Sequence, residues 1–106
     1  MAMTQQCLSS LNDIAVDEAR EQTLAACAKA LAHPARIRLL RILTISDSCL
    51  GNDLVEQLGL AQSTVSEHLR ILREAGFIHA EVQHPRTCFS LNTEAVAQFR
   101  ALLVYL

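Results

Sequence analysis

The stretch that decides the fold is GNDLVEQLGLAQSTVSEHLRILREAG, residues 51–76 of a chain of 106 residues. Its first part has helical spacing over 52–58 and stops at Gly59, a residue that tolerates the left-handed conformation at a helix end. A second helical pattern covers 62–75, and Gly76 follows it. Two short helices joined by a tight turn predict a helix-turn-helix.

The second helix, 62–75, is amphipathic. At about 100° per residue its large apolar side chains gather on one side, which predicts a core face made of Val65, Leu69 and Leu72. The other side carries small hydroxyls and charges: Ser63, Ser66, Glu67 and Arg70. A recognition helix needs small polar side chains that approach base edges and an arginine that pairs with guanine or phosphate. An ordinary surface helix shows the same polarity, so the DNA-binding interpretation depends also on the elements around it.

Those elements complete a winged helix. Helical spacing predicts further helices over 16–32, 34–45 and 93–105, and Cys49-Leu50 suggests a short extended piece. Alternating apolar residues on both sides of Pro85 predict a hairpin. The order helix, helix, short strand, helix, helix, hairpin, helix defines the predicted class, a mainly α chain with a small β-hairpin wing.

The predicted DNA-contacting residues lie on the second helix of the motif and at the tip of the hairpin. The start of that helix offers free N–H groups to phosphate, although a capping box between Thr64 and Glu67 is an alternative there. Glu67 opposes phosphate binding unless it accepts from a cytosine or pairs with Arg70 or Arg36. His68 is either a phosphate contact or a packed ring. The predicted contacts are Gln62, Ser63, Thr64, Ser66, His68, Arg70 and Arg86.

Composition limits the other classes of function. The formal net charge is −2, and 51% of the residues are hydrophobic, which is high for a small domain and favours a subunit interface. The apolar runs are too short to cross a bilayer, and no secretory signal opens the chain, so we expect a cytoplasmic protein. Neither a nucleophile elbow, a phosphate loop nor a metal-ligand spacing is present, which argues against an enzyme. Residues 1–13 are expected to form a flexible arm, and 14–106 the DNA-binding and dimerisation domain.

Two runs resemble the ArsR/SmtB repressors: DLVEQLGLAQSTVSEHLRILREAGFI at 53–78 and ALAHPARIRLL at 30–40. The resemblance covers about residues 20–105. It implies a homodimer that pairs through its first and last helices and represses an operon until an effector binds. The apolar residues expected at that dimer interface are Leu24, Cys27, Leu31, Val96, Phe99, Leu102 and Leu103.

The effector is open at this stage. One metal site of the family uses a Cys-x-Cys pair, of which this chain has only Cys49, with Gly51 in the second place; another uses Asp and His on the last helix, where 93–106 has neither. In a winged helix, Cys49 and Cys88 would lie on neighbouring extended segments. The two thiols could bind arsenite or antimonite, form a redox-sensitive disulfide, or simply pack as small hydrophobes. Cys7 is a conceivable third ligand, and Cys27 a packing residue.

Two further alternatives stay open. The chain could be a regulator that responds to no effector, or a winged helix that binds protein instead of DNA. An apolar or acidic outer face on 62–75 would favour protein binding, and the serines and Arg70 on that face argue against it. The sequence therefore predicts a double-stranded DNA-binding regulator, a repressor released by a thiophilic metalloid or metal ion or by thiol oxidation.

Overall fold

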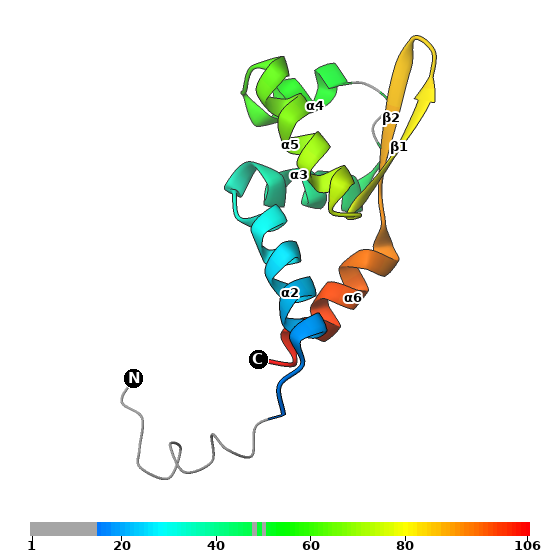
Figure 1. Ribbon diagram of the computed structural model, residues 1–106. Coiled ribbons are helices and arrows are strands. Elements are labelled where there is room, and N and C mark those ends of the chain that lie inside the picture. Colours follow the sequence, from blue (N-terminus) through cyan, green and yellow to red (C-terminus); the bar gives the residue numbers. More distant parts are fainter. Residues whose placement is uncertain (1–14, 48, 50) are drawn as a thin grey trace.

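The computed structural model describes residues 15–47, 49 and 51–106 of the chain. Figure 1 shows helices and one hairpin in the order α2 (Glu18–Leu31), α3 (Pro34–Ile45), α4 (Gly51–Leu58), α5 (Gln62–Glu74), β1 (Ile78–Gln83), β2 (Arg86–Leu91) and α6 (Thr93–Leu103). The predicted mainly α class with a hairpin wing is confirmed. The predicted arm, 1–13, and Cys7 lie outside the described residues. None of the described helices is long and apolar enough to cross a membrane.

The helices α4 and α5 form the predicted helix-turn-helix, and a glycine in the left-handed region follows each of them. Gly59 has φ +66° and its N–H donates to the carbonyl of Val55 at 2.9 Å. Gly76 has φ +86°, which lets the N–H of Phe77 reach the carbonyl of Leu72 at 3.0 Å. A side chain with a Cβ is strained at such angles, so the two glycines fix where the motif turns and where it ends.

The core lies between α3, α4, α5 and the start of the hairpin. Leu39 and Leu43 of α3 are buried, which makes α3 the central helix. From α5, the three residues expected on the core face are buried: Val65, Leu69 and Leu72. Leu54, Phe77, Ile78 and, from α2, Ala30 complete the cluster. Burial of one side of α5 leaves its opposite side facing solvent.

The wing is the antiparallel pair β1–β2, in which Ile78 lies opposite Leu91 and Gln83 opposite Arg86. It projects beside α4 and α5 (Figure 1). Of the short strand expected at Cys49-Leu50, Cys49 lies in a bend, and Leu50 lies outside the described residues. The sheet of the described residues has two strands.

The helices α2 and α6 extend away from the helix-turn-helix and pack against each other at the other end of the molecule (Figure 1). Asn92 caps α6, since its side chain accepts from the N–H of Ala95 at 3.2 Å. The helix ends at Leu103, two residues before the predicted end. Ala30 is the one buried residue of α2, and α6 has none, so this end is thinly packed within the single chain.

Candidate DNA-binding face

The outer face of α5 is polar and accessible. Gln62, Ser63, Thr64 and Ser66, all predicted contacts, are exposed. The N-cap of α5 is Ala61, which makes no side-chain hydrogen bond, so the predicted alternative of a Thr64–Glu67 capping box is wrong. A helix start without a side-chain cap keeps N–H groups available, and such groups with the helix dipole favour an anion such as phosphate.

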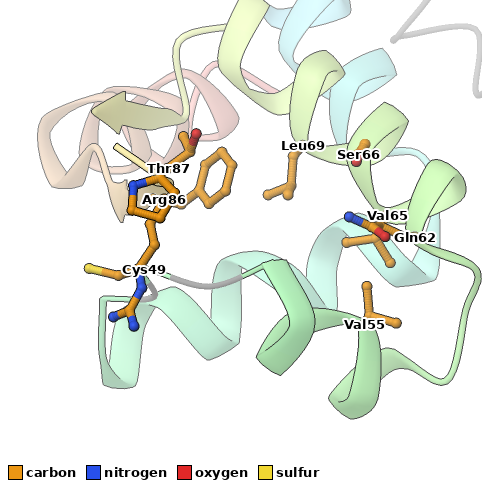
Figure 2. A pocket seen from close by; sticks show the side chains of 10 residues that line it. Cys49, Val55, Gln62, Val65, Ser66, Leu69, Arg86 and Thr87 are labelled. Carbon is orange, nitrogen blue, oxygen red and sulfur yellow. The ribbon is translucent and has the colours of Figure 1, made fainter. Parts of the chain in front are cut away.

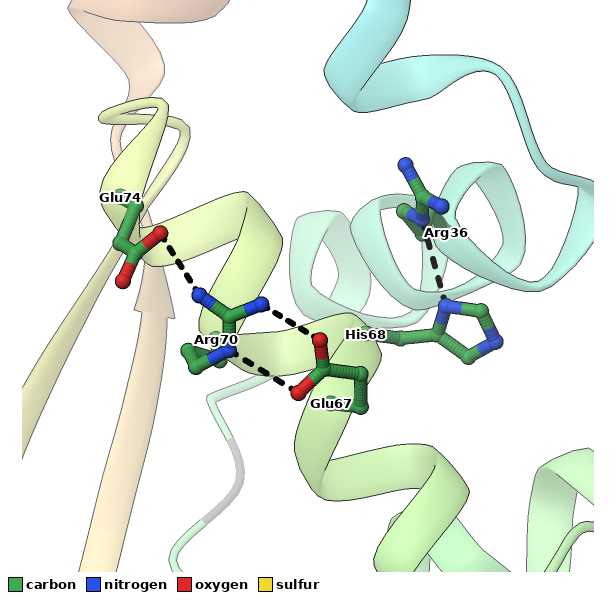
Figure 3. A network of polar contacts seen from close by, with 5 residues as sticks. All are labelled: Arg36, Glu67, His68, Arg70 and Glu74. Atoms are coloured by element: carbon green, nitrogen blue, oxygen red, sulfur yellow. Dashed lines mark hydrogen bonds and ion pairs between the residues drawn. The ribbon is translucent and has the colours of Figure 1, made fainter.

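Arg70 lies on the same face and is paired with two carboxylates of its own helix (Figure 3). Its Nε donates to Oε2 of Glu67 at 2.9 Å, and its Nη1 donates to Oε2 of Glu74 at 2.8 Å. The hydrogen bond from Arg70 lowers the pKa of Glu67, and both carboxylates raise the pKa of Arg70. Of the partners predicted for Glu67, Arg70 is therefore the one observed. These side chains are about half exposed, so water and salt screen the pairs and a phosphate or base can compete for Arg70.

His68 does not lie on this face. It is 7% exposed and points toward α3, where its Nδ1 accepts a hydrogen bond from Nε of Arg36 at 3.2 Å (Figure 3). The prediction that His68 contacts phosphate is wrong because the ring is turned into the core. The packed-ring alternative is the correct one.

A hollow of about 260 Å³ separates α5 from the wing (Figure 2). The predicted contact Arg86 lines one end of this hollow. A second hollow of about 220 Å³ continues to Arg70 and Arg73, and Ser66 and Thr87 line both hollows. Arg73 and Thr87 are absent from the predicted contacts. The spacing of Ser66, Arg70 and Arg73 along one helix face could have identified Arg73, whereas Thr87 needed the register of the hairpin. The recognition helix and the wing thus flank one basic channel.

Cys49 and Cys88, which sequence reasoning placed on neighbouring segments, are joined as a disulfide. Cys88 belongs to β2 and Cys49 precedes α4, so the bond ties the wing to the helix-turn-helix. Cys49 is exposed and lines the same hollow as Arg86 (Figure 2). Cys27 is a free thiol that packs against the core. Among the residues described, no cluster of three or more His, Cys, Asp or Glu side chains could hold a metal ion.

The residues predicted for the dimer interface lie on α2 and α6, and the single chain does not test their role. Cys27, Leu31, Val96 and Phe99 pack partly against the core of their own chain. Leu103 is 43% exposed. The remaining two, Leu24 and Leu102, are partly exposed.

The second helix of this helix-turn-helix shows a polar face, and a hairpin with a basic tip lies beside it. These features define a winged-helix DNA-binding transcriptional regulator. Comparison with known proteins narrows this class. Residues 33–80 match the family model described as "Bacterial regulatory protein, arsR family". The chain is 31% identical over 93 residues to the HTH-type transcriptional regulator YgaV of Escherichia coli (strain K12), covering 88% of this chain and 94% of YgaV. The chain belongs to the arsR family of transcriptional regulators.

Further relatives agree with this assignment. The HTH-type transcriptional regulator Rv0081 of Mycobacterium tuberculosis (strain ATCC 25618 / H37Rv) is 36% identical over 74 residues, and the chain spans 65% of its length. The crystal structure of a possible transcriptional regulator for arsenical resistance has a TM-score of 0.67 at 31% identity, covering 73% of this chain and 79% of that one. The transcriptional repressor BigR from Xylella fastidiosa has a TM-score of 0.66 at 26% identity, covering 98% and 97%.

Proposed function

We propose that the chain is a homodimeric cytoplasmic repressor that binds operator DNA through α5 and the wing, and that the Cys49–Cys88 pair controls its affinity. The observation that carries the proposal is the disulfide that joins β2 to the segment before α4. One redox-active bond connects the two parts that would hold DNA. A relative named as a biofilm growth-associated repressor, from Xylella fastidiosa (strain 9a5c), supports repression: it is 31% identical over 81 residues.

The DNA contacts follow from the exposed groups. Gln62, Ser63, Thr64, Ser66 and Arg70 would enter the major groove with α5. Arg86 at the wing tip would contact the backbone, with Arg73 on a phosphate between them. We expect gel shifts or fluorescence anisotropy with a duplex from the chain's own promoter region to show saturable binding that weakens with salt. A folded dimer that does not bind this duplex at low salt contradicts the proposal.

The dimer is supported by the thin packing of α2 and α6. No residue of α6 is buried in the single chain, although the helix carries leucines and a phenylalanine. A second copy on this layer would bury them and would place two α5 helices for two half-sites about 34 Å apart. Leu103→Glu is expected to give monomers in analytical ultracentrifugation. Val82→Glu, a change at a residue 63% exposed on the wing, is the matched control and should stay dimeric.

The switch is a two-electron oxidation. The thiols of Cys49 and Cys88 lose two protons and two electrons to an oxidant such as a peroxide or a small disulfide, and the S–S bond forms. The crosslink fixes the wing relative to α4, so Arg86 and α5 cannot adjust to the duplex together. Oxidation would therefore release DNA. The direct bond between the two sulfurs favours oxidation over metalloid binding as the signal, because arsenite would need further ligands besides these two cysteines.

The test compares operator affinity of the reduced and the oxidised protein, with arsenite added to the reduced protein as a separate arm. Oxidation should weaken binding by about tenfold in the wild type, a change of about 1.4 kcal/mol. Cys49→Ser and Cys88→Ser should not respond, while Cys27→Ser should behave as the wild type. Release by arsenite alone, lost in Cys49→Ser, would assign the metalloid instead. Equal affinity in every state would indicate a regulator without a thiol effector.

A further inference from the structure

The recognition helix carries one polar side chain on its buried side. His68 is the sole buried polar residue in the part of the chain that the structure describes, while Ser66, Glu67 and Arg70 around it are exposed. A buried imidazole costs free energy unless it is hydrogen-bonded, so its partner is informative.

That partner, Arg36, connects three helices. Its Nε donates to Nδ1 of His68 at 3.2 Å, and its Nη1 donates to the carbonyls of Lys29 at 3.2 Å and Ala30 at 3.0 Å. Lys29 and Ala30 belong to the last turn of α2. Arg36 belongs to the first turn of α3 and His68 to α5 (Figure 3). One guanidinium therefore holds the recognition helix to the end of α2, whose far end packs on α6.

The bond sets the protonation state of His68. A guanidinium only donates, so Nδ1 of His68 must carry a lone pair and the ring must be neutral with its hydrogen on Nε2. The groups that face the ring reinforce this state: burial lowers the pKa of His68, and so do the nearby His33 and Arg36, against a small opposing effect of Glu67. The ring of His33 lies 4.4 Å from that of His68, and its own Nδ1 accepts from the N–H of Ala35 at 3.0 Å.

Protonation of His68 would remove the acceptor and place a second cation beside Arg36. We propose that Arg36 and His68 are positioning residues that form a proton-sensitive latch, which holds α5 in the orientation that binds DNA and releases it when His68 is protonated. The proposal rests on DNA binding through α5. It predicts that operator affinity falls on acidification.

The sign of this effect separates the latch from ordinary electrostatics. Acidification adds protons, and so positive charge, to any protein, and added positive charge by itself favours contact with the phosphates of DNA. Without the latch, affinity should rise or stay level as the pH falls. With it, affinity should drop about tenfold, because the protonated ring can no longer accept the hydrogen bond from Arg36 that holds α5.

The experiment measures operator affinity of the reduced protein by fluorescence anisotropy at constant ionic strength from about pH 8 to about pH 5, a range that extends below the ordinary pKa of histidine because that of His68 is lowered. His68→Asn places an amide oxygen near the position of Nδ1 and does not titrate, so its affinity should lose the drop at acidic pH. His79→Asn, the matched control, should keep the wild-type profile. The latch is refuted if His68→Asn shows the same drop as the wild type, or if the wild type shows none.

A second measurement needs no variant and no DNA. NMR of the unmodified protein should show His68 as the Nε2-protonated tautomer at neutral pH, with the Nε–H signal of Arg36 losing its protection from solvent exchange as His68 titrates. A His68 protonated at Nδ1, or an Arg36 signal that ignores the titration, overturns the latch. A wild type that binds no operator at neutral pH refutes the proposed function instead, and the NMR result then decides the latch alone.

Discussion

Two polar networks lie on opposite sides of α5 and differ in how exposed they are. The difference indicates which network contacts DNA and which one positions the helix. On the outer side of α5, Arg70 pairs with Glu67 and Glu74, all about half exposed. On the inner side, buried His68 pairs with Arg36, which also holds two carbonyls of α2. Exposed pairs exchange partners at small cost, whereas a buried polar group left without a partner destabilises the fold. The outer network is therefore suited to trade its bonds for DNA, and the inner one to keep α5 in place.

The largest expected effect comes from breaking the inner network. Arg36→Met removes the donor to three acceptors, His68 Nδ1 and the carbonyls of Lys29 and Ala30, and should lower the free energy of unfolding by about 2–3 kcal/mol. Arg38→Met, at an exposed position of the same helix, should change it by less than about 0.5 kcal/mol. Urea denaturation monitored by circular dichroism gives both values. Equal losses in the two variants would mean that the inner network does not stabilise the fold.

The next effect comes from removing the cation of the outer network. Arg70→Ala should weaken operator binding by about tenfold to thirtyfold, because an arginine on a recognition helix contacts guanine or phosphate. The midpoint of urea unfolding should hardly move, since the side chain is exposed and its pairs are screened. Arg100→Ala on α6 removes the same charge away from α5 and should leave affinity within about twofold. Similar losses in both variants would indicate a response to net charge alone.

A smaller effect is expected at the basic channel between α5 and the wing. Arg73→Gln and Arg86→Gln should each weaken binding by about fivefold and reduce the salt dependence of log K by about 0.9, the value for one phosphate contact. Anisotropy titrations over a range of salt concentrations measure both quantities. An unchanged slope in Arg86→Gln would show that the wing tip does not touch the backbone.

The sequence was sufficient to predict those helices and strands whose local residue pattern matches the way they pack. Helical period and the two left-handed glycines predicted α4 and α5, and alternation around Pro85 predicted the hairpin. The core face of α5 also followed from spacing alone, because Val65, Leu69 and Leu72 share one side of any α-helix.

The features that residue spacing could not predict depend on partners that are distant in the sequence. At about 100° per residue, His68 lies about 60° from Val65, at the border between core and solvent. Its burial was decided by Arg36, 32 residues earlier. The proximity of Cys49 and Cys88 was foreseen from fold geometry, and their role remains a prediction.

The smallest expected effect on operator affinity comes from a change that makes the outer face of α5 bind DNA more tightly. Glu67→Gln removes a carboxylate that competes with DNA for Arg70 and repels phosphate, so operator affinity should rise by about threefold. The effect has a defined pH range. Because the bond from Arg70 lowers the pKa of Glu67 from 4.5, the wild-type side chain is ionised at every pH above that value, and the two proteins should differ throughout. Only below that lowered pKa does Glu67 take up a proton, and the difference should then disappear. A variant that binds more weakly than the wild type would instead show that Glu67 accepts a hydrogen bond from the operator, as a cytosine contact requires.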